Sequence, residues 1–169
     1  EQPVHKVYLD AFFIDIHQLS VAQYARFLEN TRHDVPPEWS LMNRPQNQNR
    51  PIANVDWADA AAYCKWAGKR LATEAEWEKA ARGTDGRTYP WGNEPPTALH
   101  ANSGKDVWNN HAVLTTVGSF EEGKSPYGVY DMAGNVWEWV GDWYDQNYYK
   151  ASPQQNPTGP PMGLYKVIR

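Results

Sequence analysis

The residues with the clearest capacity for chemistry lie together at positions 127–139, in the run Tyr-Gly-Val-Tyr-Asp-Met-Ala-Gly-Asn-Val-Trp-Glu-Trp. Its glycines permit backbone conformations with positive φ, while Asp131, Asn135 and Glu138 carry side-chain oxygens. A folded loop can bring such oxygens around one hard cation, with backbone carbonyls completing the shell. The alternative is that Asp131 and Asn135 cap turns through their own backbone, while Trp137 and Trp139 pack against the rest of the domain.

Further segments of the chain combine aromatic, glycine and acidic residues in a distinctive order. They are Pro51-Ile-Ala-Asn-Val-Asp-Trp-Ala-Asp-Ala-Ala-Ala-Tyr-Cys-Lys-Trp-Ala-Gly-Lys-Arg-Leu-Ala-Thr-Glu-Ala-Glu-Trp-Glu-Lys-Ala-Ala-Arg-Gly83 and Tyr89-Pro-Trp-Gly-Asn93. In these motifs, and in the run at 127–139, the chain resembles the formylglycine-generating enzyme family, also called the sulfatase-modifying factors. The resemblance spans nearly the whole chain.

The resemblance implies an α+β domain with the C-type-lectin-like fold of the formylglycine-generating enzyme type, in which much of the structure is irregular. The family domain begins one strand earlier than this chain and continues past Arg169. We therefore expect residues 1–169 to form a single domain that is incomplete at its N- and C-terminal edges.

The resemblance also implies structural calcium sites. In the first, Asp131 and Glu138 would supply side-chain oxygens, and Gly134 and Val136 would supply carbonyls. A second site would use the Asn102 side chain, the Ser103 carbonyl and the loop that contains Asp106, Asn109 and His111. Trp137 would line a substrate groove. Calcium favours a periplasmic or extracellular setting, where that ion is plentiful.

The activity that the resemblance implies is the O₂-dependent oxidation of a substrate cysteine to formylglycine, at a copper ion held by two thiolates. Thiolates suit Cu(I) because both are soft. The chain has a single cysteine, Cys64, whose place on a helical apolar stripe favours a structural role. Residues 1–169 therefore cannot perform this oxidation alone, and copper is expected only if a cysteine pair lies beyond Arg169.

These observations leave two classes of function open. The chain is part of a formylglycine-generating enzyme whose cysteine pair lies elsewhere, or it is a non-catalytic, calcium-stabilised, lectin-like binding or structural subunit. A protein or peptide is the expected partner in either class, and a glycan is the alternative partner for the second class.

Composition limits the number of domains and the kinds of partner that the chain can have. The 169 residues, of which 41% are hydrophobic, are enough for one domain with a sizeable core. The formal net charge of -4, without a cluster of Lys or Arg, argues against nucleic acid or an anionic membrane as the main partner. The chain contains no apolar run of about 18 residues, so we expect no membrane span.

Other catalytic arrangements find little support in the sequence. The histidines never fall at the His-x-x-x-His spacing of helical metal sites, so a mononuclear iron site is not expected. The acidic residues Glu74, Glu76 and Glu78 fit the first turn of a helix better than an acid/base pair, because carboxylates are stabilised at that end of the helix dipole.

Helices and strands must position these residues. Helices are predicted after the caps Ser20, Asp56 and Thr73, with Gly68 and Gly83 ending the second and third. The apolar faces of these helices are predicted as Val21, Tyr24, Phe27 and Leu28; Trp57, Ala60, Ala61, Cys64 and Ala67; and Trp77, Ala80 and Ala81. Strands are predicted at 5–17, with a bend, and at 115–119 and 137–140. The family resemblance implies a further strand at 166–169.

Overall fold

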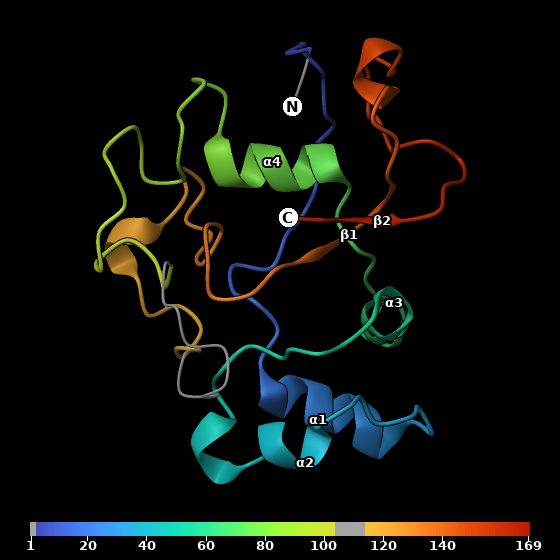
Figure 1. The fold of residues 1–169 in the computed structure, drawn as a ribbon, viewed down its shortest axis with the longest axis vertical. Helices are drawn as coiled ribbons and strands as arrows, with labels where there is room; N and C mark the ends of the chain where they lie inside the picture. Colours follow the sequence, from blue (N-terminus) through green and yellow to red (C-terminus); the bar gives the residue numbers. More distant parts are fainter. Residues whose placement is uncertain (1–2, 104–113) are drawn as a thin grey trace.

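A computed structural model of the chain describes residues 3–103 and 114–169, and it forms an α+β arrangement with long irregular connections (Figure 1). The predicted mixture of helices, a small sheet and much irregular structure is confirmed. In chain order the elements are α1 (Val21–Asn30), α2 (Trp39–Met42), η1 (Pro45–Asn47), α3 (Trp57–Trp66), α4 (Glu74–Arg82), η3 (Glu121–Gly123), β1 (Trp139–Trp143), η4 (Tyr148–Lys150) and β2 (Lys166–Ile168).

The main helices begin where local capping chemistry places them. In α1 the Gln23 amide donates to Ser20 Oγ over 3.3 Å, and the Ser20 amide donates to Gln23 Oε1 over 2.9 Å. The same reciprocal box joins Thr73 and Glu76 at the start of α4. Each box satisfies two backbone donors that the first helical turn leaves unpaired, so the predicted helix starts are confirmed.

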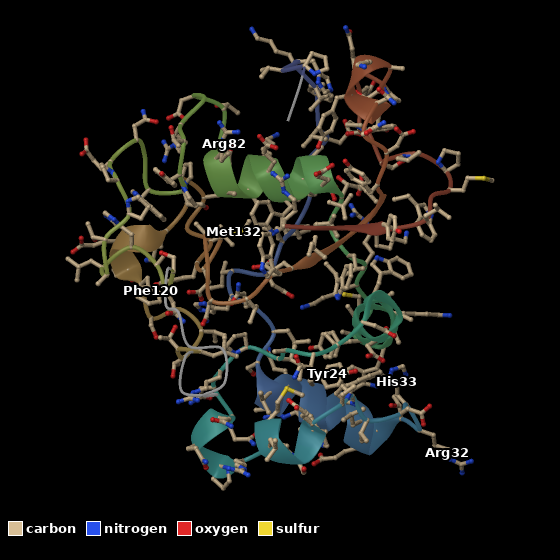
Figure 2. The ribbon with its side chains drawn as sticks, viewed as in Figure 1. Tyr24, Arg32, His33, Arg82, Phe120 and Met132 are labelled. Atoms are coloured by element: carbon tan, nitrogen blue, oxygen red, sulfur yellow. The ribbon has the colours of Figure 1, made fainter. Side chains whose placement is uncertain are left out.

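One hydrophobic core joins α1, α2 and α3. Its buried members are Tyr24, Phe27, Met42, Ile52 and Tyr63. Figure 2 shows Tyr24 and His33 on this helical half of the molecule. The predicted stripe on α3 is confirmed in part: Cys64 and Ala67 are half-buried and pack against this core, whereas the one fully buried residue of the helix, Tyr63, was not predicted.

A second hydrophobic core forms where α4 packs against the segment at 127–139. It contains Ala80 and Ala81 from α4 together with Val129 and Met132, and Met132 lies beneath α4 in Figure 2. The small alanine side chains let the helix approach this segment closely. The loop that carries Asp131 is therefore held against a helix on one side.

The sheet consists of the antiparallel pair β1 and β2, and β1 contacts both α3 and α4 (Figure 1). The indole of Trp57 donates to the Val140 carbonyl over 2.9 Å, and the Gly141 amide donates to the Ala72 carbonyl over 2.8 Å. The strand predicted at 166–169 is confirmed as β2, whereas the strand predicted at 137–140 begins two residues later, at Trp139.

The other predicted strands do not form. Residues 5–17 form no strand: Tyr8 makes an isolated bridge to Gln155, and the Ile16 carbonyl accepts from the Tyr130 amide over 2.9 Å. At 115–119 the amides of Thr115 and Gly118 donate to side-chain oxygens, and the Val117 amide donates to the Asn49 carbonyl. Both segments find scattered partners in place of one neighbouring strand, so no ladder is built.

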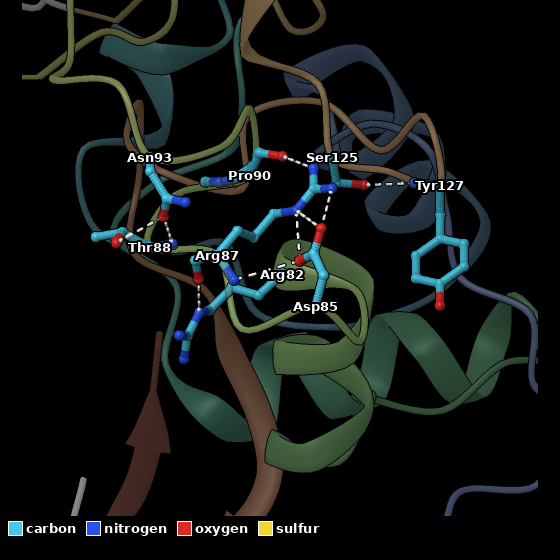
Figure 3. Close-up of polar contacts among 8 residues, drawn as sticks. All are labelled: Arg82, Asp85, Arg87, Thr88, Pro90, Asn93, Ser125 and Tyr127. Atoms are coloured by element: carbon cyan, nitrogen blue, oxygen red, sulfur yellow. Dashed lines mark hydrogen bonds and ion pairs between the residues drawn. The ribbon is translucent and has the colours of Figure 1, made fainter.

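The connection after α4 is held by polar contacts (Figure 3). Arg87 hydrogen-bonds to Asp85, which lowers the pKa of Asp85 to about 2, and also donates to the Pro90 carbonyl over 3.0 Å. Beyond it Tyr89, Trp91 and His100 stack, with centroid distances of 5.0 and 4.7 Å. This stack ends at His100, two residues before Asn102.

In the part of the chain that the structure describes, no helix has the length and apolar character needed to cross a membrane.

Candidate functional site

The loop at 127–139 is shaped by residues with left-handed backbone conformations. Asp131 and Asn135 have φ of 58° and 67°, and Gly134 has φ of 127°. A Cβ atom on Gly134 would lie 2.7 Å from the Asn102 carbonyl oxygen, so only glycine fits at this position. These turns direct several oxygens of one short loop toward a common point.

The side chain of Gln18 lies at that point and contacts three oxygens of the loop. The sequence did not identify this residue as part of the site. Its Nε2 lies 2.7 Å from Glu138 Oε1, 3.2 Å from the Asp131 carbonyl oxygen and 3.3 Å from the Gly134 carbonyl oxygen. Gln18 is 8% exposed and immediately precedes the segment that caps α1. The sequence held no local signal for this role, because the partners of Gln18 lie more than 110 positions away along the chain.

The carboxylate of Glu138 is enclosed by neutral donors. Its Oε1 accepts from the Gln18 amide, and its Oε2 accepts from the indole of Trp77 over 3.0 Å. Burial raises the pKa of Glu138, the two hydrogen bonds oppose this rise, and the neighbouring charge of Asp131 adds to it. A carboxylate in such surroundings is better stabilised when a cation is also present.

The carboxylate of Asp131 is also buried. Its Oδ2 accepts from the Gly118 amide over 2.7 Å, whereas its Oδ1 has no hydrogen-bond partner among the described residues. Burial raises the pKa of Asp131, while the Gly118 bond lowers it. Asp131 therefore contributes its carbonyl oxygen to the point where the Gln18 contacts meet, while its Oδ1 is buried without a partner among the described residues.

Asn135 connects this loop to two other segments. Its amide nitrogen donates to the Thr115 carbonyl over 3.2 Å, and its Oδ1 accepts from the Thr115 amide over 3.0 Å. The Asn135 backbone amide donates to the Asn102 carbonyl over 3.1 Å, and the Asn102 side chain donates to Asn135 Oδ1 over 3.3 Å. Asn135 thus joins the loop at 127–139 to the two segments that contain Asn102 and Thr115.

The predicted calcium ligands fall into three groups. Oxygens of Asp131, Gly134 and Glu138 converge on Gln18, whereas Val136 contacts the Gly134 carbonyl through its own amide, over 3.0 Å. Asn102 and Ser103 line the same cleft, with Asn102 buried and Ser103 exposed. Asn109 and His111 lie outside the described residues.

The donor set fits a hard cation better than a soft one. Across residues 3–103 and 114–169, no group of three His, Cys, Asp or Glu side chains could hold a metal ion by itself. The convergent set combines the half-buried Glu138 carboxylate with the backbone carbonyls of Asp131 and Gly134, and calcium accepts such mixed oxygen ligands. A two-thiolate copper site does not fit this chain, because its one cysteine packs against the helical core and does not line the cleft.

A cleft of about 840 Å³ opens beside these oxygens. The segment at 51–55 forms part of its lining, the loop at 131–139 forms another part, and Ile168 of β2 and Arg169 also line it. Trp137 lies on the wall of the cleft and is 68% exposed. Trp139 is half-buried, because its indole donates to the Val55 carbonyl over 2.9 Å.

The cleft also borders backbone groups of β2 that β1 does not use. Glu138 and Arg169 exchange both backbone hydrogen bonds, at 2.7 and 2.9 Å. Ile168, which lies opposite Trp139, is therefore in a non-hydrogen-bonded pair, and its N–H and C=O point away from β1. The edge of β2 consequently offers a donor and an acceptor next to the cleft.

Comparison with known proteins identifies one domain family over the full length of the chain. The family model described as "Sulfatase-modifying factor enzyme 1-like domain" matches residues 1–169. The formylglycine-generating enzyme of Streptomyces coelicolor is 34% identical over 223 residues, which cover 100% of this chain and 69% of that protein. The formylglycine-generating enzyme of Bos taurus is 31% identical, over 99% of this chain and 58% of that protein.

A protein named serine/threonine-protein kinase pkn1, from Chlamydia pneumoniae, is 38% identical over 100% of this chain. The match covers only 29% of that protein, so the chain corresponds to a limited part of it.

Among solved structures, the Treponema denticola variable protein 1 matches with a TM-score of 0.68 and 22% identity, over 96% of this chain and 73% of that one. A likeness at this identity concerns the fold alone. The family match and the two formylglycine-generating enzymes carry the assignment further: the chain belongs to the sulfatase-modifying factor family and has the C-type-lectin-like fold of the formylglycine-generating enzyme type.

Proposed function

We propose that residues 1–169 form the peptide-binding part of a formylglycine-generating-enzyme-type domain, stabilised by calcium. The observation that carries this proposal is the cleft beside the Trp137 side chain and the unused backbone edge of β2. Exposed tryptophans are frequent anchors of binding energy, and an extended peptide can pair with an open strand edge.

A peptide fits this surface better than a glycan does. The N–H and C=O groups of Ile168 point away from β1, and an extended peptide backbone offers the complementary acceptor and donor. Trp137 would then contact a side chain of the bound peptide. A glycan could stack on Trp137 but would not repeat the backbone spacing of a strand.

Oxidation of a bound cysteine by O₂ is proposed only for a chain that also supplies a pair of thiolates. Within residues 1–169 the single cysteine, Cys64, packs against the core between α1 and α3. If a cysteine pair follows Arg169, the peptide held in the cleft would be the substrate. Without that pair, the same cleft would act as a binding site, in a calcium-stabilised, non-catalytic subunit.

The calcium part of the proposal places the ion among the oxygens of Asp131, Gly134, Val136 and Glu138. The ion would neutralise the buried Glu138 carboxylate and hold the loop that carries Trp137. Its role would be structural, because these groups belong to the loop itself and metal binding can stabilise a domain that is poor in regular structure. The second proposed site would use Asn102, Ser103, Asn109 and His111.

Peptide binding can be tested by fluorescence anisotropy with a labelled, extended peptide centred on cysteine and with its serine counterpart. We expect binding of the cysteine peptide, and a loss of at least about tenfold in affinity for Trp137→Ala, which is about 1.4 kcal/mol. Trp66→Ala is the matched control, because Trp66 is 43% exposed and does not line the cleft. Equal affinity for Trp137→Ala and wild type would refute the assignment of the cleft.

An activity assay separates the two forms of the proposal. The full native polypeptide is incubated with copper, O₂, a thiol reductant and the cysteine peptide, and mass spectrometry is used to detect the aldehyde. The peptide sulfur leaves as sulfide, and the reductant supplies the two further electrons that reduce O₂ to water. Aldehyde formation would identify an enzyme, while tight binding without aldehyde would identify a binding subunit.

A further inference from the structure

A second groove, of about 520 Å³, lies at the C-terminal ends of α1 and α3. Its lining includes Phe27, Thr31, Arg32 and His33 from the end of α1 and the residues after it, and Lys65 and Trp66 from the end of α3. None of these residues lines the cleft beside Trp137, and Figure 2 shows Arg32 and His33 away from Met132. The groove is therefore separate from the surface that the proposed function uses.

Aromatic rings form the apolar part of the groove. The ring of Phe27, a residue that is 2% exposed, lies 5.7 Å from the ring of Trp66 and 5.0 Å from that of His33, measured between centroids. Trp66 also contacts the buried ring of Tyr63, at 5.8 Å, and is itself 43% exposed. Trp66 thus combines a packed ring with an open surface, which suits an anchor for a partner because little side-chain freedom is lost on binding.

The segment after α1 is held in place by local hydrogen bonds. The hydroxyl of Thr31, the C-cap of α1, donates to the Phe27 carbonyl over 2.8 Å, and the His33 amide donates to Thr31 Oγ1 over 3.3 Å. The Nε2 atom of His33 lies 2.7 Å from Asp59 Oδ1. Arg32 lies between these fixed residues, so the groove is formed before any partner binds.

The charged side chains that line the groove are cationic. Arg32 and Lys65 are exposed, and neither forms an ion pair or a side-chain hydrogen bond within residues 3–103 and 114–169. The lining contains no Asp or Glu, and the nearby Asp59 carboxylate is engaged by His33 and by the Asp56 amide. In a chain with a formal net charge of -4, this surface is complementary to an anionic partner.

A competing explanation assigns both cations to the helix ends. Lys65 lies in the last turn of α3, and Arg32 directly follows the C-cap of α1. Cations at these places offset the partial negative charge of a helix C-terminus, which is about half an elementary charge. Two full positive charges exceed that demand, and the dipole does not explain the aromatic groove between them.

We propose that this groove binds a segment of a partner protein that carries an aspartate or glutamate next to an aromatic side chain. The carboxylate would pair with Arg32 and Lys65, and the aromatic ring would pack on Trp66. A protein segment fits better than a small molecule, because small-molecule sites enclose most of the ligand, whereas these three residues are exposed. Tryptophan and arginine are also frequent anchors of protein interfaces.

The test measures, by fluorescence anisotropy, how a labelled peptide, Gly-Ser-Asp-Tyr-Asp-Ser-Gly, binds to the full native polypeptide. One control peptide has lysine in place of both aspartates, and another has alanine in place of the tyrosine. The protein variants are Trp66→Ala and the double variant Arg32→Ala with Lys65→Ala. Arg44→Ala is the matched control, because Arg44 is exposed and does not line the groove.

We expect the acidic aromatic peptide to bind wild type at least about tenfold more tightly than either control peptide. The double variant and Trp66→Ala should each lose at least about tenfold in affinity, and Arg44→Ala should lose none. Binding should also weaken as salt rises from about 0.1 M to about 1 M, because exposed charges are screened. Circular dichroism checks the fold, and if Trp66→Ala does not fold, the double variant, which changes exposed side chains alone, decides the question.

Three results would overturn the proposal: no binding to wild type, equal binding of the lysine peptide, or full affinity in the double variant. Arg32 and Lys65 would then serve the helix ends alone. Self-association of wild type in sedimentation, abolished in the double variant, would make a second copy the occupant and would also overturn it. The inference does not rest on the proposed function, since the cysteine peptide should bind the double variant and wild type equally.

Discussion

Substitution of Gly134 by alanine tests whether the loop beside the cleft depends on the close approach of Asn102. Gly134 has φ of 127°, and a Cβ atom there would lie 2.7 Å from the Asn102 carbonyl oxygen. That carbonyl accepts the Asn135 amide over 3.1 Å. The substitution therefore adds backbone strain and also forces apart a hydrogen-bonded contact.

Gly92 supplies a matched control. Its φ is 134°, close to that of Gly134, but no atom lies within 4 Å of a Cβ built at Gly92. Both substitutions should cost about 1–3 kcal/mol in backbone strain. Gly134→Ala should cost about 2 kcal/mol more, because a buried hydrogen bond is lost and its acceptor is left unsatisfied.

The measurement is the free energy of unfolding from urea titration, together with Tm, for both variants. For a domain of this size about 2 kcal/mol corresponds to roughly 4–8 °C, so Gly134→Ala should melt lower than Gly92→Ala by that amount. Equal losses in the two variants would mean that the contact with Asn102 contributes nothing, and the close packing of the loop would not be what requires glycine.

Further predictions concern other elements. Arg70 lowers the pKa of Glu76, so the stabilisation by this pair is present above the unfolded pKa of about 4.3 and is lost as pH falls through the folded value. Glu76→Gln, which can still complete the cap, should lower stability by about 0.5 kcal/mol at neutral pH, and this difference should shrink in thermal melts as pH falls below the unfolded pKa. Burial raises the pKa of the Cys64 thiol; its reaction with a disulfide reagent at pH 8 should be about tenfold slower in native protein than in urea, and equal rates would contradict this. Trp77→Phe keeps an aromatic side chain but removes the indole N–H that donates to Glu138 and reduces the ring volume, so urea unfolding should show a loss of at least about 2 kcal/mol. An unchanged midpoint would contradict the contribution of that hydrogen bond.

Local features of the sequence were sufficient for the helix starts. The partners in the capping boxes of α1 and α4 are three residues apart, so the sequence alone brings Ser20 to Gln23 and Thr73 to Glu76. Gly83 likewise ends α4 through its own backbone, with φ of 66°. Such contacts depend on neighbours along the chain, and prediction from the sequence therefore succeeded.

Strands were predicted less well, because a strand depends on a partner elsewhere. The segments at 5–17 and 115–119 have β-prone residues, but tertiary structure gives their backbones scattered partners. On α3 the periodicity pointed to the small residues, whereas packing against α1 selected Tyr63. In each case the deciding contact is remote in the sequence.

The same distinction applies to the candidate site. The sequence by itself determined that Asp131, Gly134 and Glu138 share one short, turn-rich loop, because the spacing of glycines and acidic residues is local. Only the tertiary structure decided that Gln18 and Trp77 enclose the Glu138 carboxylate, 120 and 61 residues away in the chain. The physical reason is that the raised pKa of Glu138 arises from burial between separate segments, and burial is a property of the folded chain.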